Sequence, residues 1–198
     1  MKNYFSKTLL FSALLLLACS SAIEQKRGSI TQEFKDYWYQ GLAEISIYEL
    51  EQARYGEIHH GEAQLVFVTE DFSTKKMVKL DDPQNVLDRK PILKLNAMKK
   101  FYTGVYPYSI MTSVFSPVDE SPLLKLTSSS QEWCGHTFMQ VTKNRKDYSY
   151  QLHSYFESEE GKEGHLSAQY FEDAIWNLIR LNPSKLPLGA IEMTPSAM

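Results

Sequence analysis

The feature of this sequence that most constrains its fold is a series of short apolar or alternating segments separated by turn residues. In the first segment Ala43, Ile45 and Ile47 alternate with polar residues, which predicts a strand buried on one face. Further strands are expected at residues 63–69, 77–80, 92–98, 106–115, 123–129, 133–142 and 148–156. Long alternation of strands with helices is absent. The sequence therefore predicts a mainly β protein, an antiparallel curved sheet or barrel of about eight strands.

One short helix is expected before these strands and one after them, which makes the fold α+β. Ser29 and Gln32 have the spacing of a capping box, and this predicts a helix over residues 30–38. Ser167 is the expected N-cap of the second helix. The pair Asn182-Pro183 is expected to end that helix, because proline cannot continue it.

The C-terminal helix is expected to be amphipathic. Its apolar residues recur at helical spacing and form one broad stripe, which must cover a sheet face or plug an opening. The stripe consists of Tyr170, Phe171, Ala174, Ile175, Leu178 and Ile179. Trp176 lies nearly opposite the stripe, and two interpretations stay open. Either a loop or the N-terminal segment covers it, or it anchors a partner or a membrane surface.

The first eighteen residues have the layout of a signal peptide. Lys2 and Lys7 precede an apolar run over residues 9–18. A run of about ten residues is roughly half of what a helix needs to cross a bilayer, so no permanent transmembrane anchor is expected. The run ends in Leu-Leu-Ala-Cys, which resembles the lipobox of bacterial lipoproteins and implies that Cys19 carries the lipid. The expected location is the cell envelope, with the membrane as partner through this lipid; the alternative is an ordinary secretory signal with an incidental cysteine.

Residues 19–28 are small and polar like a tether, which leaves residues 29–198 as a single β-rich domain. Loss of the signal removes Lys2 and Lys7 but no acid, so the formal net charge changes from −3 to −5. A mildly acidic exported domain is a poor binder of nucleic acid, and no such partner is expected. Once Cys19 is lipidated, Cys134 is the remaining thiol and no disulfide can form within the chain.

A compact polar cluster around Cys134 and His136 is the candidate for chemistry. On a strand these side chains point to one side with Trp133 on the other, and a thiolate beside an imidazole is what nucleophilic catalysis requires. No sequence feature supplies an orienting third group, and the motifs of phosphate loops, α/β-hydrolases and zinc proteases are absent. We therefore expect a buried, structural Cys134 with a raised pKa and a hydrogen-bonded His136. A thiol-dependent hydrolase is the alternative.

Metal binding is a further alternative for the same cluster. His60, Cys134 and His136 carry the ligand atoms that zinc prefers. However, His59 and His60 are adjacent and would point to opposite faces of a strand, and the other histidines have no ligand spacing to Cys134. The acids in residues 157–163 lack the alternating ligands of a calcium loop and are expected to form a solvated hairpin tip. No metal and no cofactor are expected.

Five segments resemble a family of uncharacterised bacterial lipoproteins. They are FKDYWYQG at residues 34–41, EQARYGE at 51–57, YPY at 106–108, EWCGHTF at 132–138 and RLNP at 180–183. The resemblance covers essentially the whole chain after the signal and implies no established activity. It also implies that members continue past residue 198, and residues 189–193 begin a strand-like alternation that soon stops. A truncation at Met198 is therefore an expectation to test.

Some members of that family carry the label septum formation inhibitor Maf. True Maf proteins are cytoplasmic nucleotide pyrophosphatases with a Leu-Ala-Ser-x-Ser-Pro-Arg-Arg loop. Here the nearest string, residues 17–22, is the lipobox and lacks Pro-Arg-Arg, so no active-site residue can be carried over. The sequence favours a non-catalytic envelope lipoprotein that binds a lipid-like ligand or a protein partner. The alternatives are a thiol- or metal-dependent hydrolase and, by label alone, a septum formation inhibitor.

Overall fold

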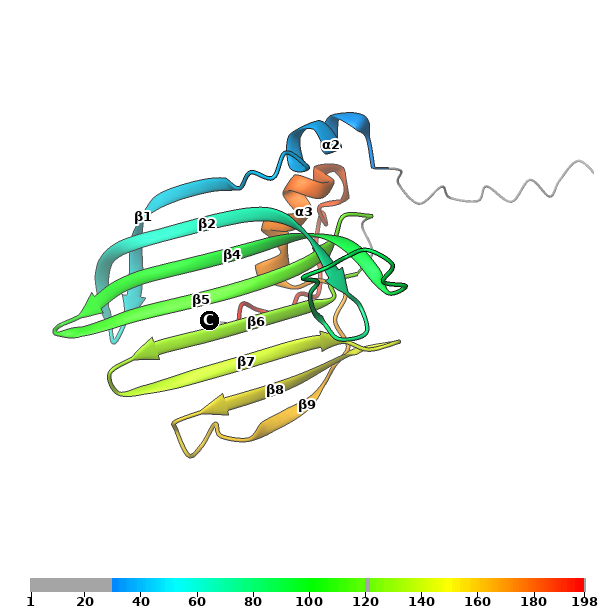
Figure 1. The fold of residues 1–198 in the computed structure, drawn as a ribbon. Helices are drawn as coiled ribbons and strands as arrows, with labels where there is room; N and C mark the ends of the chain where they lie inside the picture. The colour runs from blue at the N-terminus through cyan, green and yellow to red at the C-terminus, as the bar shows by residue number, and fades with distance from the viewer. Residues whose placement is uncertain (1–29, 120–121, 198) are drawn as a thin grey trace, which may run out of the picture.

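Strands dominate the computed structural model, which describes residues 30–119 and 122–197 (Figure 1). In this part of the chain, nine strands form one antiparallel sheet. They are β1 (Glu44–Arg54), β2 (Glu57–Ser73), β3 (Val78–Lys79), β4 (Arg89–Thr103), β5 (Tyr106–Pro117), β6 (Lys125–Glu132), β7 (Gly135–Lys143), β8 (Tyr148–Ser154) and β9 (Lys162–Leu166). The order is β1-β2-β4-β5-β6-β7-β8-β9, with β3 beside β2. The sheet is open, because β1 and β9 are its two edges and do not pair with each other. Figure 1 shows that it is also curved.

Three details of the strand prediction are wrong. The acidic segment, predicted as turn throughout, ends in β9, whose charged Lys162 and Glu163 suit an edge strand. β2 is 17 residues long because its polar residues also pair with the long strands β1 and β4. Trp133 and Cys134 are not in a strand. Glu132 pairs with Gly135, which leaves those two residues as the turn between β6 and β7.

The core lies on the concave face of the sheet. Phe67, Leu95, Val114, Leu126 and Val141 are register partners on five neighbouring strands, and each is at most 2% exposed. We call these five residues the Phe67 row. Two short helices, α2 (Gln32–Trp38) and α3 (Ile175–Leu181), pack against it (Figure 1). Because side chains alternate between the faces of a strand, every second residue along each strand also points to this side.

Helix α2 is fixed to the sheet at its C-terminal end. It begins after Thr31, whose side-chain oxygen accepts a hydrogen bond from the Phe34 amide (3.1 Å). Ser29, the predicted cap, lies outside the described residues. Trp38 is 6% exposed, and its carbonyl accepts a hydrogen bond from the Thr69 hydroxyl (2.7 Å) on β2.

Helix α3 is shorter than predicted. The start at Ser167 is wrong, because Phe171 is extended and forms an isolated parallel bridge with Thr194. A short 3-10 turn, Glu172–Ala174, then leads into the helix. The predicted end is confirmed, since the Asn182 amide donates to the Leu178 carbonyl (2.8 Å) and caps the helix. The long-range bridge takes residues that local helical spacing had assigned to the helix.

Helix α3 also turns a different face toward the sheet than the apolar stripe predicts. Asn177 is fully buried, whereas Ile179 is 38% exposed. The Asn177 side-chain amide donates to the Leu93 carbonyl (3.0 Å) and to the Ser116 hydroxyl (2.9 Å). A polar residue therefore joins α3 to β4 and β5, because these strands offer it hydrogen-bond partners.

Candidate functional site

The predicted chemical cluster lies at the turn between β6 and β7. Cys134 is exposed there, so the prediction of a buried cysteine in an apolar strand is wrong. Its amide donates a hydrogen bond to the Glu132 carboxylate (2.7 Å). Desolvation and the neighbouring Glu132 carboxylate raise the pKa of the Cys134 thiol, which reduces the thiolate fraction at neutral pH. The predicted direction of the pKa shift is therefore confirmed at an exposed site.

His136 follows on β7 without the contacts of a catalytic base. In residues 30–119 and 122–197 its imidazole has no hydrogen-bond partner. A nucleophile needs a base that a third group orients. Cys134, His136 and His153 do line one surface hollow of about 520 Å³. The hollow brings the predicted residues together, but no nucleophile, base and orienting group are hydrogen-bonded within it.

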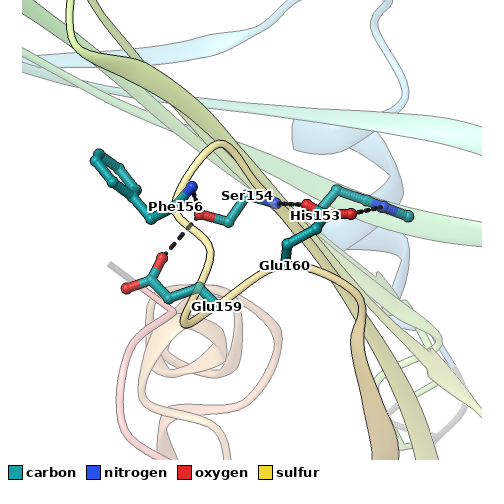
Figure 2. Close-up of polar contacts among 5 residues, drawn as sticks. All are labelled: His153, Ser154, Phe156, Glu159 and Glu160. Carbon is teal, nitrogen blue, oxygen red and sulfur yellow. Dashed lines mark hydrogen bonds and ion pairs between the residues drawn. The ribbon is translucent and has the colours of Figure 1, made fainter.

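The carboxylates of the acidic turn after β8 accept hydrogen bonds from Ser154, at the end of that strand (Figure 2). The Ser154 amide donates to Glu160 (2.6 Å), and the Ser154 hydroxyl donates to Glu159 (2.9 Å). The same hydroxyl accepts from the Phe156 amide (3.1 Å), and His153 Nδ1 lies 3.7 Å from Glu160 Oε1. The turn is exposed, as predicted, and these contacts hold it closed.

The predicted metal ligands are not brought together. His60 lies on β2, and strands β4 and β5 separate it from the turn that carries Cys134. His165, on β9, contacts Asp147 instead (2.9 Å). No group of three His, Cys, Asp or Glu side chains in the described part of the chain is placed to hold a metal ion.

An apolar groove of about 460 Å³ lies on the concave face beside the core. Strands β1, β2, β4 and β5 form its floor, and Trp176 of α3 stands at its edge. Its apolar lining consists of Tyr48, Leu50, Ala63, Leu65, Ala97, Met98, Ile110, Val114 and Trp176. The volume falls within the range of roughly 300–1,000 Å³ that is typical of small-molecule sites.

The groove is a continuation of the core that neither α2 nor α3 covers. Tyr48, Ala63, Lys99 and Ile110 are register partners on the four floor strands, and we call them the open row. The Phe67 row lies further along the same strands on the same face. α2 and α3 cover the Phe67 row, whereas in the open row Tyr48 is 48% exposed and Lys99 and Ile110 are half-buried. The floor thus has mainly apolar side chains on its inward face, like the buried part of the sheet, but neither α2 nor α3 packs on it.

The tip of the β1–β2 hairpin closes one end of this face. Tyr55 and Gly56 have φ values of +53° and +81°, as a two-residue type I′ turn requires. The Tyr55 hydroxyl lies 3.2 Å from the Tyr108 hydroxyl, and the Arg54 guanidinium lies 4.7 Å from the centre of the Tyr108 ring. Tyr108 stacks on Phe101 at 4.8 Å, and both rings are buried. The hairpin therefore folds over the sheet beyond the open row.

Gly61 allows this fold of the hairpin. A Cβ atom at Gly61 would lie 2.1 Å from the backbone oxygen of Lys100 and 2.8 Å from Cβ of Phe101. No other residue type fits without a shift of β4, because backbone rather than a flexible side chain blocks the space. The close approach of β2 to β4 next to the open row thus depends on glycine.

The charged side chains of the groove differ in their partners. At the end near α3, Glu172 accepts a hydrogen bond from the Ser196 amide (2.9 Å). Asp173 accepts from the Ser196 hydroxyl (2.7 Å) and the Ala197 amide (2.9 Å). Lys99, in the open row, has no ion pair or hydrogen bond with any residue that the structure describes. Glu172 and Asp173 hold the C-terminal segment in place. Glu49 on β1 also lines the groove but is exposed, and like Lys99 it has no hydrogen-bond or ion-pair partner among the described residues.

Trp176 was predicted to be either covered or a partner anchor. It is 46% exposed and borders the groove, so neither a loop nor the N-terminal residues that the structure describes cover it fully. Its role as an anchor stays a prediction.

Sequence reasoning missed the groove and Lys99, although β4 carried a signal. The positions of β4 that face the core are occupied by apolar residues except one. They are Leu93, Leu95, Ala97, Lys99 and Phe101. A lysine that interrupts an apolar alternation marks a place where the core is open, and this pattern could have identified Lys99.

Comparisons with protein-family models, with curated proteins and with solved structures found no match to this chain. None of the helices in residues 30–119 and 122–197 is long and apolar enough to cross a membrane. Cys19, the predicted lipidation site, lies outside the described residues. A functional proposal therefore has to start from the groove itself.

Proposed function

We propose that this chain is a non-catalytic lipoprotein of the cell envelope that binds a lipid-like ligand in the concave groove. The observation that supports the proposal is the largely apolar groove along the open row, which continues the core and is covered by neither α2 nor α3. Burial of apolar surface contributes about 25 cal/mol per Å², so an alkyl chain laid along Leu65, Ala97 and Ile110 would bind by the same effect that forms the core.

No observation favours the hydrolase to the same degree. Cys134 has a raised pKa, and the His136 imidazole has no hydrogen-bond partner among the residues described. The lipobox resemblance supports the envelope location, because lipid on Cys19 would hold the domain at a membrane surface.

Native mass spectrometry of the full chain, purified from membranes of the producing cells, tests the ligand. We expect a retained adduct of lipid mass in the parent protein. Ile110→Trp should lose it, because the larger ring fills the floor of the groove. Met111→Trp is the matched control: Met111 is the next residue, on the opposite face of β5, and is 41% exposed. The control should retain the adduct.

The proposal fails if the parent carries no adduct and does not increase the fluorescence of Nile red, an uncharged apolar probe. It also fails if Ile110→Trp and Met111→Trp bind this probe equally well. Circular dichroism of both variants shows whether they are folded.

Membrane attachment is tested separately. Cells grown with a radiolabelled fatty acid should label the parent chain but not Cys19→Ala, because the thiol of Cys19 is the expected site of the lipid. Equal labelling of the two proteins would exclude the lipid anchor and leave the groove proposal to be judged on its own.

A further inference from the structure

Lys99 is the only cation among the described residues that line the groove, whose other charged residues are Glu49, Glu172 and Asp173. It lies on β4 between its register partners Ala63 on β2 and Ile110 on β5, and it lines the groove. It is half-buried. No carboxylate of the described residues pairs with it. A partly buried lysine ammonium is stabilised further when a ligand supplies the opposite charge.

The other charges along this face set the direction in which a ligand would lie. Glu172 and Asp173, at the α3 end, are negative and already accept hydrogen bonds from the C-terminal segment. The Arg54 guanidinium covers the Tyr108 and Tyr55 rings at 4.7 and 5.0 Å. The third carboxylate of the lining, Glu49, is exposed on β1, whereas Lys99 is half-buried within the groove. An anion would therefore be repelled at the α3 end and attracted at Lys99, and an alkyl chain would lie on the apolar surface between Lys99 and Trp176.

We propose that the ligand is a long-chain amphiphile with an anionic head group, which Lys99 binds, and that its chain lies along the groove toward Trp176. This inference rests on the proposed function and adds the chemical class of the ligand. A lysine ammonium is a compact positive charge that donates hydrogen bonds to carboxylate and phosphate alike, so the shared property is the negative head group. The nature of that head is decided by experiment.

The test is displacement of Nile red from the full chain by three ligands with the same alkyl chain. They are dodecanoate, dodecyl phosphate and 1-dodecanol, used below the concentrations at which they form micelles. At least one of the two anions should bind about tenfold more tightly than the alcohol, because hydrogen bonds to charged groups contribute more than neutral ones. The preferred anion identifies the head as a carboxylate or a phosphate.

Lys99→Met keeps most of the length of the side chain and removes its charge. It should weaken binding of the preferred anion about tenfold and leave the affinity for the alcohol unchanged. Lys99→Arg should restore the affinity for the anion. Lys100→Met is the matched control. Lys100 is the next residue, exposed on the opposite face of β4, and its loss should change none of the three affinities.

The inference is overturned if the alcohol binds the parent as tightly as both anions, or if Lys99→Met and Lys100→Met have equal effects. Either result leaves the groove as an apolar site. Absence of Nile red binding and of displacement by any of the three ligands would instead overturn the proposed function. The two failures are therefore distinguishable.

Discussion

The concave face of the sheet has a covered half and an open half that are built from the same strands. In the covered half, Phe67, Leu95 and Val114 are fully buried beneath the helices. In the open half, Tyr48 is 48% exposed and Ile110 is half-buried. The reach of two short helices, rather than the strands themselves, decides which rows are core and which rows are groove. Stability should therefore reside in the covered half, and binding in the open half.

The largest effect is expected from Phe67→Ala in the covered half. Phe67 is fully buried, and the Arg180 guanidinium lies 3.5 Å from its ring centre while pairing with Glu44 at 2.5 Å. We expect the free energy of unfolding to fall by about 3–5 kcal/mol, since phenylalanine-to-alanine changes in cores leave a cavity. Urea unfolding measures the loss. Tyr48→Ala in the open half is the comparison, and its loss should be about 1 kcal/mol or less. Equal losses would show that the two halves do not differ in stability.

The second effect concerns the contact between α3 and the covered half. Asn177→Ala removes the donor to the Leu93 carbonyl and the Ser116 hydroxyl and leaves these buried acceptors without it. We expect a loss of about 1–3 kcal/mol in the free energy of unfolding, again by urea denaturation. Ile179→Ala changes the more exposed side of the same helix and should cost less. A larger loss for Ile179→Ala would mean that the predicted apolar stripe, and not Asn177, holds the helix.

The strands of the covered half could largely be predicted from sequence because alternation reports which residues share a face. The predicted segments at residues 92–98 and 106–115 fall inside β4 and β5. The start of α3 could not be predicted, because Phe171 pairs with Thr194, which is distant in sequence. β9 was missed because a charged edge strand has little apolar signal.

The open half could not be predicted because it depends on how far a helix extends over the sheet. No local pattern at Ile110 or Ala63 shows that α3 leaves them uncovered. Lys99 was the exception, since a cation at an inward position of β4 is visible in sequence. The Cys134 prediction failed for a related reason. The pairing of Glu132 with Gly135 places Cys134 in a turn, and this register between β6 and β7 cannot be read from local sequence.

A third prediction uses titration to probe the covered half. Tyr148 is 3% exposed and packs edge-on against Phe171 at 4.8 Å, and its burial raises its pKa to about 12. A tyrosine in the unfolded chain ionises near about pH 10. Because the folded value is the higher one, the stabilisation by neutral Tyr148 is complete below about pH 10 and is lost as pH rises through about 12. Desolvation also raises the pKa of Tyr39 and of Tyr108, so ultraviolet difference absorbance should show a tyrosine titration that extends to about pH 12. Tyr148→Phe should reduce its latest part by one tyrosine. An unchanged latest part in Tyr148→Phe would assign it to another residue.

The smallest effect is expected from Cys134→Ser, which lies outside both halves. The thiol is exposed at the turn between β6 and β7, so its replacement should change the free energy of unfolding by less than about 0.5 kcal/mol. Binding of Nile red should be unchanged, because Cys134 does not line the groove.

In a Cys19→Ala background, where Cys134 is the single cysteine, a thiol reagent should label the native protein readily. The reaction should nevertheless be slower than in the unfolded chain near neutral pH, because the raised pKa lowers the thiolate fraction. The difference in rate should narrow as the pH is raised. Native labelling as fast as labelling of the unfolded chain at neutral pH, together with a hydrolase activity that Cys134→Ser loses, would reopen the hydrolase alternative.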